Sequence, residues 1–228
     1  MKTNQDFKNA ALAALKGNWG AAVLATVVFI LIVLVVSGPM SVYSALHQVS
    51  PSATPAEMAA LLKNMGSVST LTVLLEFFIL IPLEIGFVNA FRKLLAFGDD
   101  NLLGNTFNFS NYWRKVGGMI LVGIFTFLWT LLLVIPGIIK AFSYSMTKYI
   151  LDDNPELSSS EAIHRSRMMM KGHKFDLFWL YLSFIGWAFL CLLTCGIGFL
   201  WLGPYMQTAE AAFYEEVKAD YALHGGLD

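Results

Sequence analysis

The sequence contains little charge. Only 14% of its 228 residues are Asp, Glu, Lys or Arg, whereas 57% are hydrophobic. An ordinary soluble domain has about 25% charged and about 45–50% apolar residues. A water-soluble chain of this length would leave much of its apolar majority facing water. The composition therefore excludes a soluble globule and predicts a protein that lives in lipid.

Cysteine is also scarce, because only Cys191 and Cys195 occur. Two cysteines build neither a disulfide framework nor a four-cysteine zinc site, so small apolar packing is their expected role. The formal net charge is −1, whereas nucleic-acid-binding domains are strongly basic. We expect no metal, no cofactor and no nucleic-acid partner.

Catalytic motifs are missing as well. The sequence has no metalloprotease histidine pair, no nucleophile elbow and no phosphate-binding Gly-Lys-Ser/Thr loop. Gly196, Gly198 and Gly203 lie in an apolar turn with no strand before them, which argues against dinucleotide binding. An enzyme is therefore the third-ranked functional class.

Long apolar runs dominate the chain instead. A helix needs about 20 mostly apolar residues to cross about 30 Å of hydrocarbon. The first run follows Phe7, Ala11 and Leu15, whose helical spacing predicts an interfacial helix leading into a retained span; a cleaved signal peptide is the alternative. The predicted spans are 19–36, 70–91, 117–135, 138–151, 176–195 and 198–214.

Turn residues divide these runs into three hairpins. Pro136 and Gly137 end the third span and let the chain return through 138–151, which is short for a full crossing. Gly196 and Gly198 divide a stretch of almost twice the length of a span. The prediction is an all-α, polytopic transmembrane helical bundle that forms one domain over residues 1–228. Its external loop covers 37–67, and its cytoplasmic connections, 92–116 and 152–175, contain amphipathic interfacial helices.

The distribution of positive charge sets the expected orientation. Six spans place both termini on one side, and all 15 Lys and Arg residues except Lys63 and Lys140 then lie at or near that side. Lysine and arginine are enriched in cytoplasmic loops. We therefore expect a plasma-membrane protein with both termini in the cytoplasm.

Four ionisable residues of the predicted spans are functional candidates, because charge is costly inside a membrane. Glu76 and Lys140 are in the outer half, and a salt bridge, worth about 4 kcal/mol at 4 Å and a dielectric near 20, is sufficient to explain them. Glu84 and Glu210 are in the inner half. Two neighbouring acids would share a proton, as in a relay, and neutralisation of Glu210 by Arg92 is the alternative.

Basic residues concentrate in the cytoplasmic connections. Ser158 and Glu161 have capping-box spacing at the start of one predicted helix there. Such cations either bind anionic headgroups, at about 1 kcal/mol each, or only set the topology. The candidates for contact with headgroups or a partner are Arg114, Lys115, Arg165, Arg167, Lys171 and Lys174.

A threefold pattern is also visible. A basic residue and a glycine precede or open each hairpin, at Lys16, Lys115 and Lys171. Pro82 and Pro204 are each followed, at the same spacing, by an Ala-Phe pair. These features suggest a hairpin repeated three times, with the returning helices at the centre; chance coincidence in apolar sequence is the alternative.

The segment 133–146, which reads Leu-Val-Ile-Pro-Gly-Ile-Ile-Lys-Ala-Phe-Ser-Tyr-Ser-Met, resembles the bacterial integral membrane family called domain of unknown function 975. The resemblance extends from about Phe7 to Tyr214 and includes residues 161–163, 166–167, 172–174, 184–187 and 204–205. It implies a polytopic bacterial inner-membrane protein with no assigned activity. A weaker resemblance, to the membrane part of some glycerophosphodiester phosphodiesterases, implies a lipid-associated module without the hydrolytic domain.

Two functional hypotheses follow. The first is a non-catalytic module that organises membrane lipids or a partner, which would be another membrane protein or a second copy of the chain. The alternative is a small transporter or exporter with a polar path through Glu76, Glu84, Lys140 and Glu210. A water-accessible cavity shared by these four residues would favour transport, whereas a packed bundle with a basic rim would favour the module.

Overall fold

The computed structural model describes residues 2–46 and 54–224, and within these ranges the secondary structure is entirely helical. The all-α prediction is therefore confirmed for this part of the chain. In order, the elements are α1 (Asn4–Leu15), α2 (Trp19–Leu46), α3 (Pro55–Leu75), η1 (Glu76–Leu80), α4 (Ile81–Phe97), α5 (Leu102–Thr106), α6 (Tyr112–Leu132), α7 (Val134–Tyr144), α8 (Thr147–Asp153), α9 (Ser159–Met169), α10 (Lys174–Leu182), α11 (Ile185–Leu193) and α12 (Phe199–His224).

Four helical segments are long and apolar enough to cross a membrane: Trp19–Gly38, Gly66–Phe97, Tyr112–Leu132 and Lys174–Leu193. They correspond to the predicted spans 19–36, 70–91, 117–135 and 176–195. The predicted total of six is not confirmed in the described part of the chain, because α7 has only 11 residues and α12 carries several charges in its second half. Length and composition thus indicate a membrane protein with four strong candidate spans.

Most of the predicted external loop 37–67 is helical. Helix α2 continues to Leu46, and α3 begins at Pro55 behind a capping box formed by Thr54 and Glu57. The predicted loop therefore runs directly into the next span, because α3, η1 and α4 follow one another without a break from Pro55 to Phe97.

A π-helical turn, η1, allows this long helix to contain Pro82. Proline has no N–H to donate to the carbonyl four residues earlier, which here belongs to Phe78. The hydroxyl group of Tyr112, at the start of α6, donates to that carbonyl instead. The carbonyl group that Pro82 leaves without a backbone donor is therefore used in a contact between two hairpins.

The turn between α6 and α7 lies slightly earlier than predicted. The break is at Leu133 (φ −160°), and Pro136 lies in the first turn of α7, where its missing N–H costs nothing. A Cβ at Gly137 would lie 2.2 Å from Thr130 Oγ1, so the glycine allows the two helices to pack closely. The predicted helix 138–151 is divided, because α7 ends at Tyr144 and α8 begins at Thr147.

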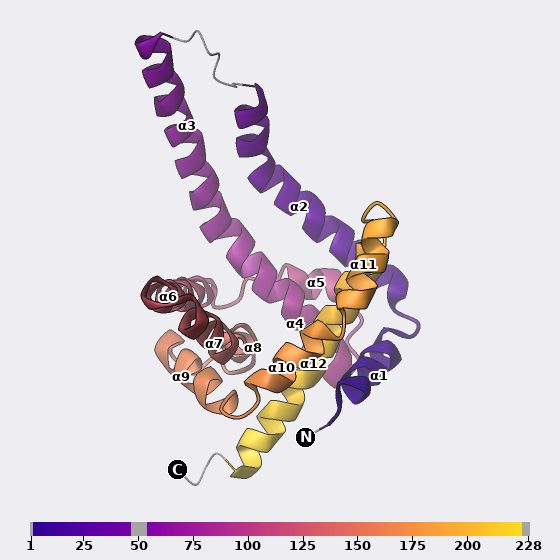
Figure 1. The fold of residues 1–228 in the computed structure, drawn as a ribbon. Helices are drawn as coiled ribbons and strands as arrows, with labels where there is room; N and C mark the ends of the chain where they lie inside the picture. The colour runs from indigo at the N-terminus through magenta and orange to yellow at the C-terminus, as the bar shows by residue number, and fades with distance from the viewer. Residues whose placement is uncertain (1, 47–53, 225–228) are drawn as a thin grey trace.

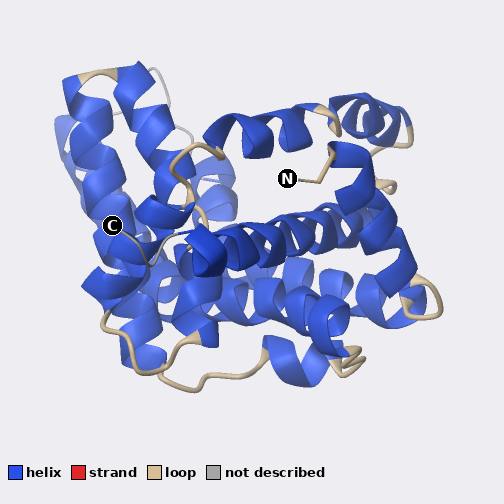
Figure 2. Ribbon diagram, turned by 90° about the horizontal axis from the view of Figure 1, so that it is seen from below, coloured by secondary structure: helices blue, strands red, loops and turns tan. Residues whose placement is uncertain are grey.

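The hairpins point in different directions from one another. In Figure 1, α2 and α3 extend away from the body as a pair, α6 is seen nearly end-on, and α12 runs diagonally across the centre. Figure 2 shows the same helices from below, with the N-terminus beside them. Only 17% of the Tyr112–Leu132 window is buried. The apolar hairpins leave most of their surface for lipid and meet mainly through the helices at their bases.

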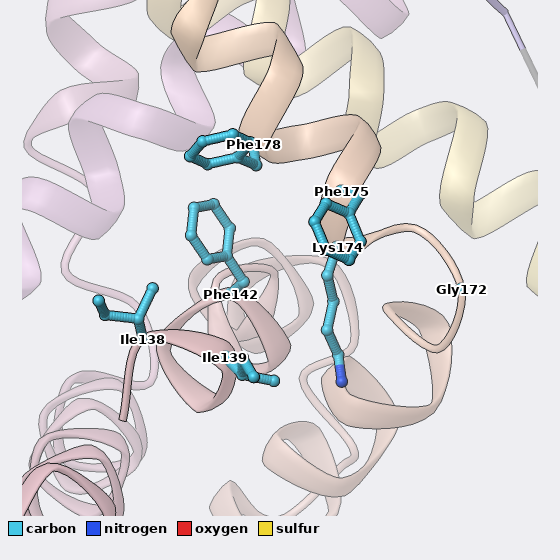
Figure 3. A pocket seen from close by; sticks show the side chains of 7 residues that line it. All are labelled: Ile138, Ile139, Phe142, Gly172, Lys174, Phe175 and Phe178. Carbon is cyan, nitrogen blue, oxygen red and sulfur yellow. The ribbon is translucent and has the colours of Figure 1, made fainter. Parts of the chain in front are cut away.

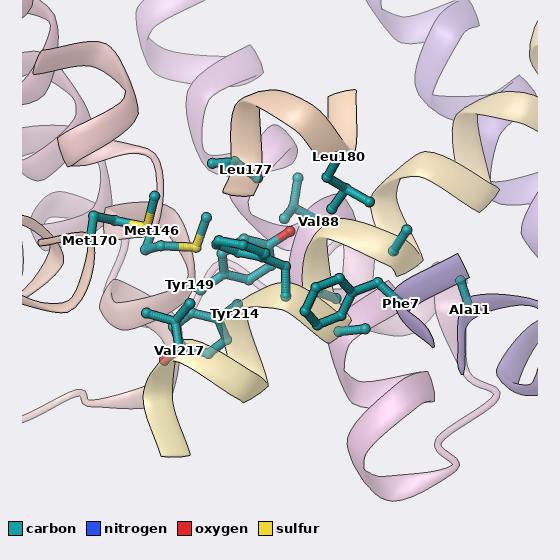
Figure 4. Close-up of a cluster of buried hydrophobic side chains, with 14 of the residues drawn as sticks. Phe7, Ala11, Val88, Met146, Tyr149, Met170, Leu177, Leu180, Tyr214 and Val217 are labelled. Atoms are coloured by element: carbon teal, nitrogen blue, oxygen red, sulfur yellow. The ribbon is translucent and has the colours of Figure 1, made fainter. Parts of the chain in front are cut away.

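The core lies where α1, α4, α8, α9, α10 and α12 come together (Figure 4). Tyr149 of α8 stacks on Tyr214 of α12 with ring centroids 4.8 Å apart. Phe7 of α1 packs edge-on against Phe213 at 5.5 Å. The apolar side of α1, predicted to rest on lipid, is therefore covered by protein. The Met169 side of α9 is likewise buried.

The order of elements repeats three times. A short helix (α1, α5 or α9) is followed by a residue with positive φ, a long apolar segment and a helix that returns to the core. The positive-φ residues are Gly17 (90°), Asn111 (53°) and Gly172 (95°). The second unit thus uses Asn111 at this position, and Gly117 and Gly118 lie inside α6.

Candidate functional site: a buried ion cluster and a basic rim

The three returning helices meet at a buried group of charges. Arg92 of α4, whose side chain is only 3% exposed, lies between two other helices. Its Nη1 atom is 3.1 Å from Asp153 Oδ1 of α8 and 3.2 Å from Glu215 Oε1 of α12, and its Nη2 atom is 4.0 Å from Asp152 Oδ2. One guanidinium therefore joins one returning helix from each of the three hairpins.

Three lysines complete this arrangement, which we call the ion cluster. Lys115 of α6 is buried and lies 2.7 Å from Asp152, and Lys93 lies 3.8 Å from the same carboxylate. Lys218 pairs with Asp153. The cluster comprises Arg92, Lys93, Lys115, Asp152, Asp153, Glu215 and Lys218.

Asp153 shows the electrostatic balance of the ion cluster. Burial raises the pKa of its carboxyl group, but the hydrogen bond from Lys218 and the charge of Arg92 outweigh burial and hold the pKa below its ordinary value. The Tyr214 hydroxyl group donates a further hydrogen bond, at 3.0 Å. Asp153 is therefore held in its ionised form.

A second buried pair lies beside the cluster. Lys148 of α8 is 2.9 Å from Glu210 of α12, and both side chains are largely buried. Asn89 connects the two groups, because its amide nitrogen donates to the Lys148 carbonyl at 3.0 Å and its oxygen accepts from Arg92 Nε at 3.1 Å. Charges of both signs are thus matched across the core.

The chemistry of the ion cluster is structural. Buried ion pairs fix orientation, and breaking one is costly because a charge is left without its partner. In the described ranges 2–46 and 54–224, there is no group of three or more His, Cys, Asp or Glu side chains arranged to hold a metal ion. The cluster fastens the returning helices together.

The predicted intramembrane pairs do not form. Glu76 accepts a hydrogen bond from Ser37 Oγ at 3.1 Å, and Lys140 Nζ lies 4.5 Å from the centre of the Trp129 ring. Lys140 also lines a cavity together with Arg167 of α9. Lys140 therefore lies beside α9, because α7 folds back along α6 toward that helix.

The second predicted pair is also separated. Glu84 is exposed, alone in an otherwise buried stretch of α4, whereas Glu210 is buried against Lys148. Arg92 pairs with Asp153 and Glu215 and leaves Glu210 to Lys148. The structure thus provides Glu210 with a cation in place of a second acid.

Three of the six predicted headgroup contacts are used inside the protein. Arg114 donates to the carbonyls of Leu151, Asn154 and Leu157 and so caps the C-terminal end of α8. Lys115 belongs to the ion cluster. Arg165 donates to Asn154 Oδ1 at 3.0 Å and lies near the ring of Tyr221.

The other three candidates form what we call the basic rim: Arg167, Lys171 and Lys174. Arg167 and Lys171 are exposed, and Lys174 is half-buried. Within the described part of the chain, none of the three forms an ion pair, whereas the seven residues of the ion cluster are all paired. The rim is therefore available to an external anion.

Two cavities adjoin the basic rim. One, of about 420 Å³, lies between α7 and α10 and is almost entirely apolar. Figure 3 shows the rings of Phe142, Phe175 and Phe178 around it, with the Lys174 nitrogen at the end of the side chain farther from the rings. The other, of about 310 Å³, lies between α6, α7 and α9.

Sequence reasoning missed most of the ion cluster. Asp152 and Asp153 immediately follow the predicted span 138–151, and Arg92 and Lys93 immediately follow the span 70–91. Paired charges of opposite sign at the inner ends of two predicted spans were the available signal. Their contact depends on how the hairpins are arranged, which the sequence pattern does not specify.

Residues 119–221 match the family model described as Protein of unknown function (DUF975). Over these residues the chain is similar to the DUF975 family, which supports the resemblance noted in its sequence. The DUF975 segment includes Asp152, Asp153 and Glu215, whereas Arg92 precedes it. The chain has no match among the curated proteins compared with it, and none among the solved structures. The resemblance to glycerophosphodiester phosphodiesterases is thus not shown, and the DUF975 match assigns no activity.

Proposed function

We propose that the protein is a non-catalytic membrane module that binds anionic lipid headgroups on its basic rim and thereby organises lipid or a partner protein. The observation that carries this proposal is the division of the cations. Those in the core are matched by acids, whereas Arg167, Lys171 and Lys174 have no paired acid in the described chain. Each such cation near an anionic leaflet contributes about 1 kcal/mol of attraction.

The arrangement of the intramembrane residues favours the module over a transporter. A polar path requires ionisable side chains that converge on water. Of the two cavities beside the basic rim, only the one next to Lys140 is lined by any of the four candidates Glu76, Glu84, Lys140 and Glu210, and Lys140 is the single one of them in its lining. No observation therefore favours the alternative of transport.

The location we propose is the bacterial inner membrane, with both termini in the cytoplasm. Lys2 Nζ lies 2.9 Å from Glu216 Oε2 of α12, which brings the start of the chain close to its last helix. The basic rim then faces the inner leaflet, where lysine and arginine are enriched and anionic lipids are available. The partner would be a membrane protein or a second copy of this chain.

Native mass spectrometry tests the function directly. The purified protein in mild detergent is mixed with equal amounts of phosphatidylglycerol and phosphatidylethanolamine that have the same acyl chains. We expect it to retain more phosphatidylglycerol, and we expect Lys171→Gln/Lys174→Gln to reduce this preference. The matched control is Lys16→Gln/Lys63→Gln, which removes two exposed cations away from the rim and leaves the preference unchanged.

Equal retention of the two lipids by the unmodified protein would exclude the proposed lipid function. Equal losses in the rim variant and in its control would show that net charge, and not the basic rim, determines the preference.

A further inference from the structure

We propose that the cavity between α6, α7 and α9 is a specific site for the phosphate group of an anionic phospholipid. This inference rests on the proposed function and deepens it, because it assigns one bound lipid to one site. The cavity, which we call the α9 cavity, has a volume of about 310 Å³ and is lined by Phe125, Trp129, Lys140, Tyr144, Ser160, Ile163, His164 and Arg167.

The polar side of the α9 cavity consists of donors. Lys140 and Arg167 provide two cations from different helices, and Ser160 and His164 add a hydroxyl group and an imidazole. The lining contains no carboxylate, and neither Lys140 nor Arg167 forms an ion pair in the described part of the chain. Charge-assisted hydrogen bonds from such groups are a common means of binding phosphate.

Lys140 is held in place by an aromatic ring. Its Nζ atom lies 4.5 Å from the centre of the Trp129 ring, one helix away, and a cation over the face of a tryptophan is attracted by the ring. Lys140 and Tyr144 are four residues apart, so they lie on the same side of α7. This side of α7 faces the α9 cavity. Ile138, Ile139 and Phe142 instead line the apolar cavity next to α10.

The other side of the α9 cavity is suited to an acyl chain. Phe125, Trp129 and Ile163 give it an apolar wall. The wall continues along the neighbouring side of α6, where Leu128 is 50% exposed and Leu132 is 71% exposed. A ligand that fits must therefore have an anionic head and a long apolar tail, which identifies a phospholipid and not a free ion.

Neither of the other two cavities combines these properties. The apolar cavity next to α10 has a single cation, Lys174, at its edge. A third cavity, between α1, α4 and α12, is lined by Lys2 and Lys16 but also by the acids Glu215 and Glu216, which repel a phosphate group. Charge complementarity thus favours the α9 cavity.

The test follows retention of phosphatidylglycerol as collisional activation increases in native mass spectrometry. Unmodified protein should keep one phosphatidylglycerol after the others have dissociated. Lys140→Gln/Arg167→Gln should lower the apparent affinity for this last lipid about thirtyfold, since two cations are removed. Lys140→Arg/Arg167→Lys keeps both charges and should retain it, which separates loss of charge from loss of folding.

Three results would overturn the proposal. If Lys140→Gln/Arg167→Gln keeps the last lipid as firmly as unmodified protein does, the α9 cavity is not the site, although the proposed function stands if the rim variant still loses its preference. If inorganic phosphate at about 10 mM displaces the lipid completely, the α9 cavity binds free phosphate and not a phospholipid. If unmodified protein retains no phosphatidylglycerol in preference, the proposed function fails together with this inference.

Discussion

At the residue scale, the chain separates its cations into two groups. Arg92, Lys115 and Lys148 are buried and matched by Asp152, Asp153 and Glu210. The cations of the basic rim are unpaired within the described chain. A topology signal in the sequence, positive charge near the cytoplasmic face, therefore has two structural outcomes. Sequence alone does not separate them, because both groups consist of the same residue types at the ends of apolar runs.

We predict that Arg92→Leu destabilises the protein strongly. The change leaves Asp153 and Glu215 without their shared guanidinium in the core, and removal of one partner of a buried pair costs about 3–5 kcal/mol. Thermal unfolding in detergent, followed by tryptophan fluorescence, should show a clearly lower midpoint. Arg92→Lys keeps the charge but not the forked geometry, so its unfolding midpoint should lie between those of Arg92→Leu and the unmodified protein.

Lys63→Gln, on the exposed side of α3, is the control and should leave the midpoint unchanged. A midpoint of Arg92→Leu equal to that of the control would show that the ion cluster does not hold the returning helices together.

At the element scale, the hairpins begin and end at residues whose backbone conformation the sequence indicates in part. The turn between α11 and α12 has positive φ at Cys195 (54°) and Gly196 (85°), where the glycine pattern predicts it. Gly172 has a φ of 95° before α10. The division of 138–151 into α7 and α8, by contrast, has no proline or glycine to mark it, and it places Lys148 and Asp152 within reach of the other hairpins.

We predict that Gly172→Ala destabilises the protein by about 1–2 kcal/mol, because a left-handed conformation is unfavourable for a residue with a Cβ atom. No atom lies within 4 Å of the added methyl group, so the cost arises from the backbone alone. Thermal unfolding measures the effect.

The control for this substitution is Gly123→Ala, which is exposed inside α6, also has free space and has no positive φ. It should be neutral or stabilising by up to about 1 kcal/mol. A similar loss in both variants would contradict the conformational explanation.

At the scale of the whole molecule, three hairpins with exposed apolar surfaces are joined at one charged and aromatic centre. The Ala-Phe pairs that follow Pro82 and Pro204 at equal spacing, residues 90–91 and 212–213, are buried at this centre. The proximity of returning helices suggested by the sequence repeat therefore has a structural counterpart in the core. The direction of each hairpin has no such signal in the sequence.

We predict that both ends of the chain face the cytoplasm and that the start of α3 faces the opposite side. Single cysteines at the exposed positions Gln5→Cys, Ala222→Cys and Ala59→Cys, in a Cys191→Ala/Cys195→Ser background, report this. In intact spheroplasts, a membrane-impermeant maleimide should label only Ala59→Cys, and permeabilisation should expose the other two. Labelling of Gln5→Cys in intact spheroplasts would exclude the proposed orientation.

The class of this protein, its apolar segments and several of their turns follow from the sequence alone. Hydropathy and turn chemistry are local properties, so runs such as 19–36 and residues such as Gly196 specify them directly. The partner of each charge, by contrast, is known only from the packing of the helices. Ion pairing depends on distances between helices that are far apart in the chain. A basic residue at the end of an apolar run is therefore buried in one case, Lys115, and exposed to solvent in another, Arg167.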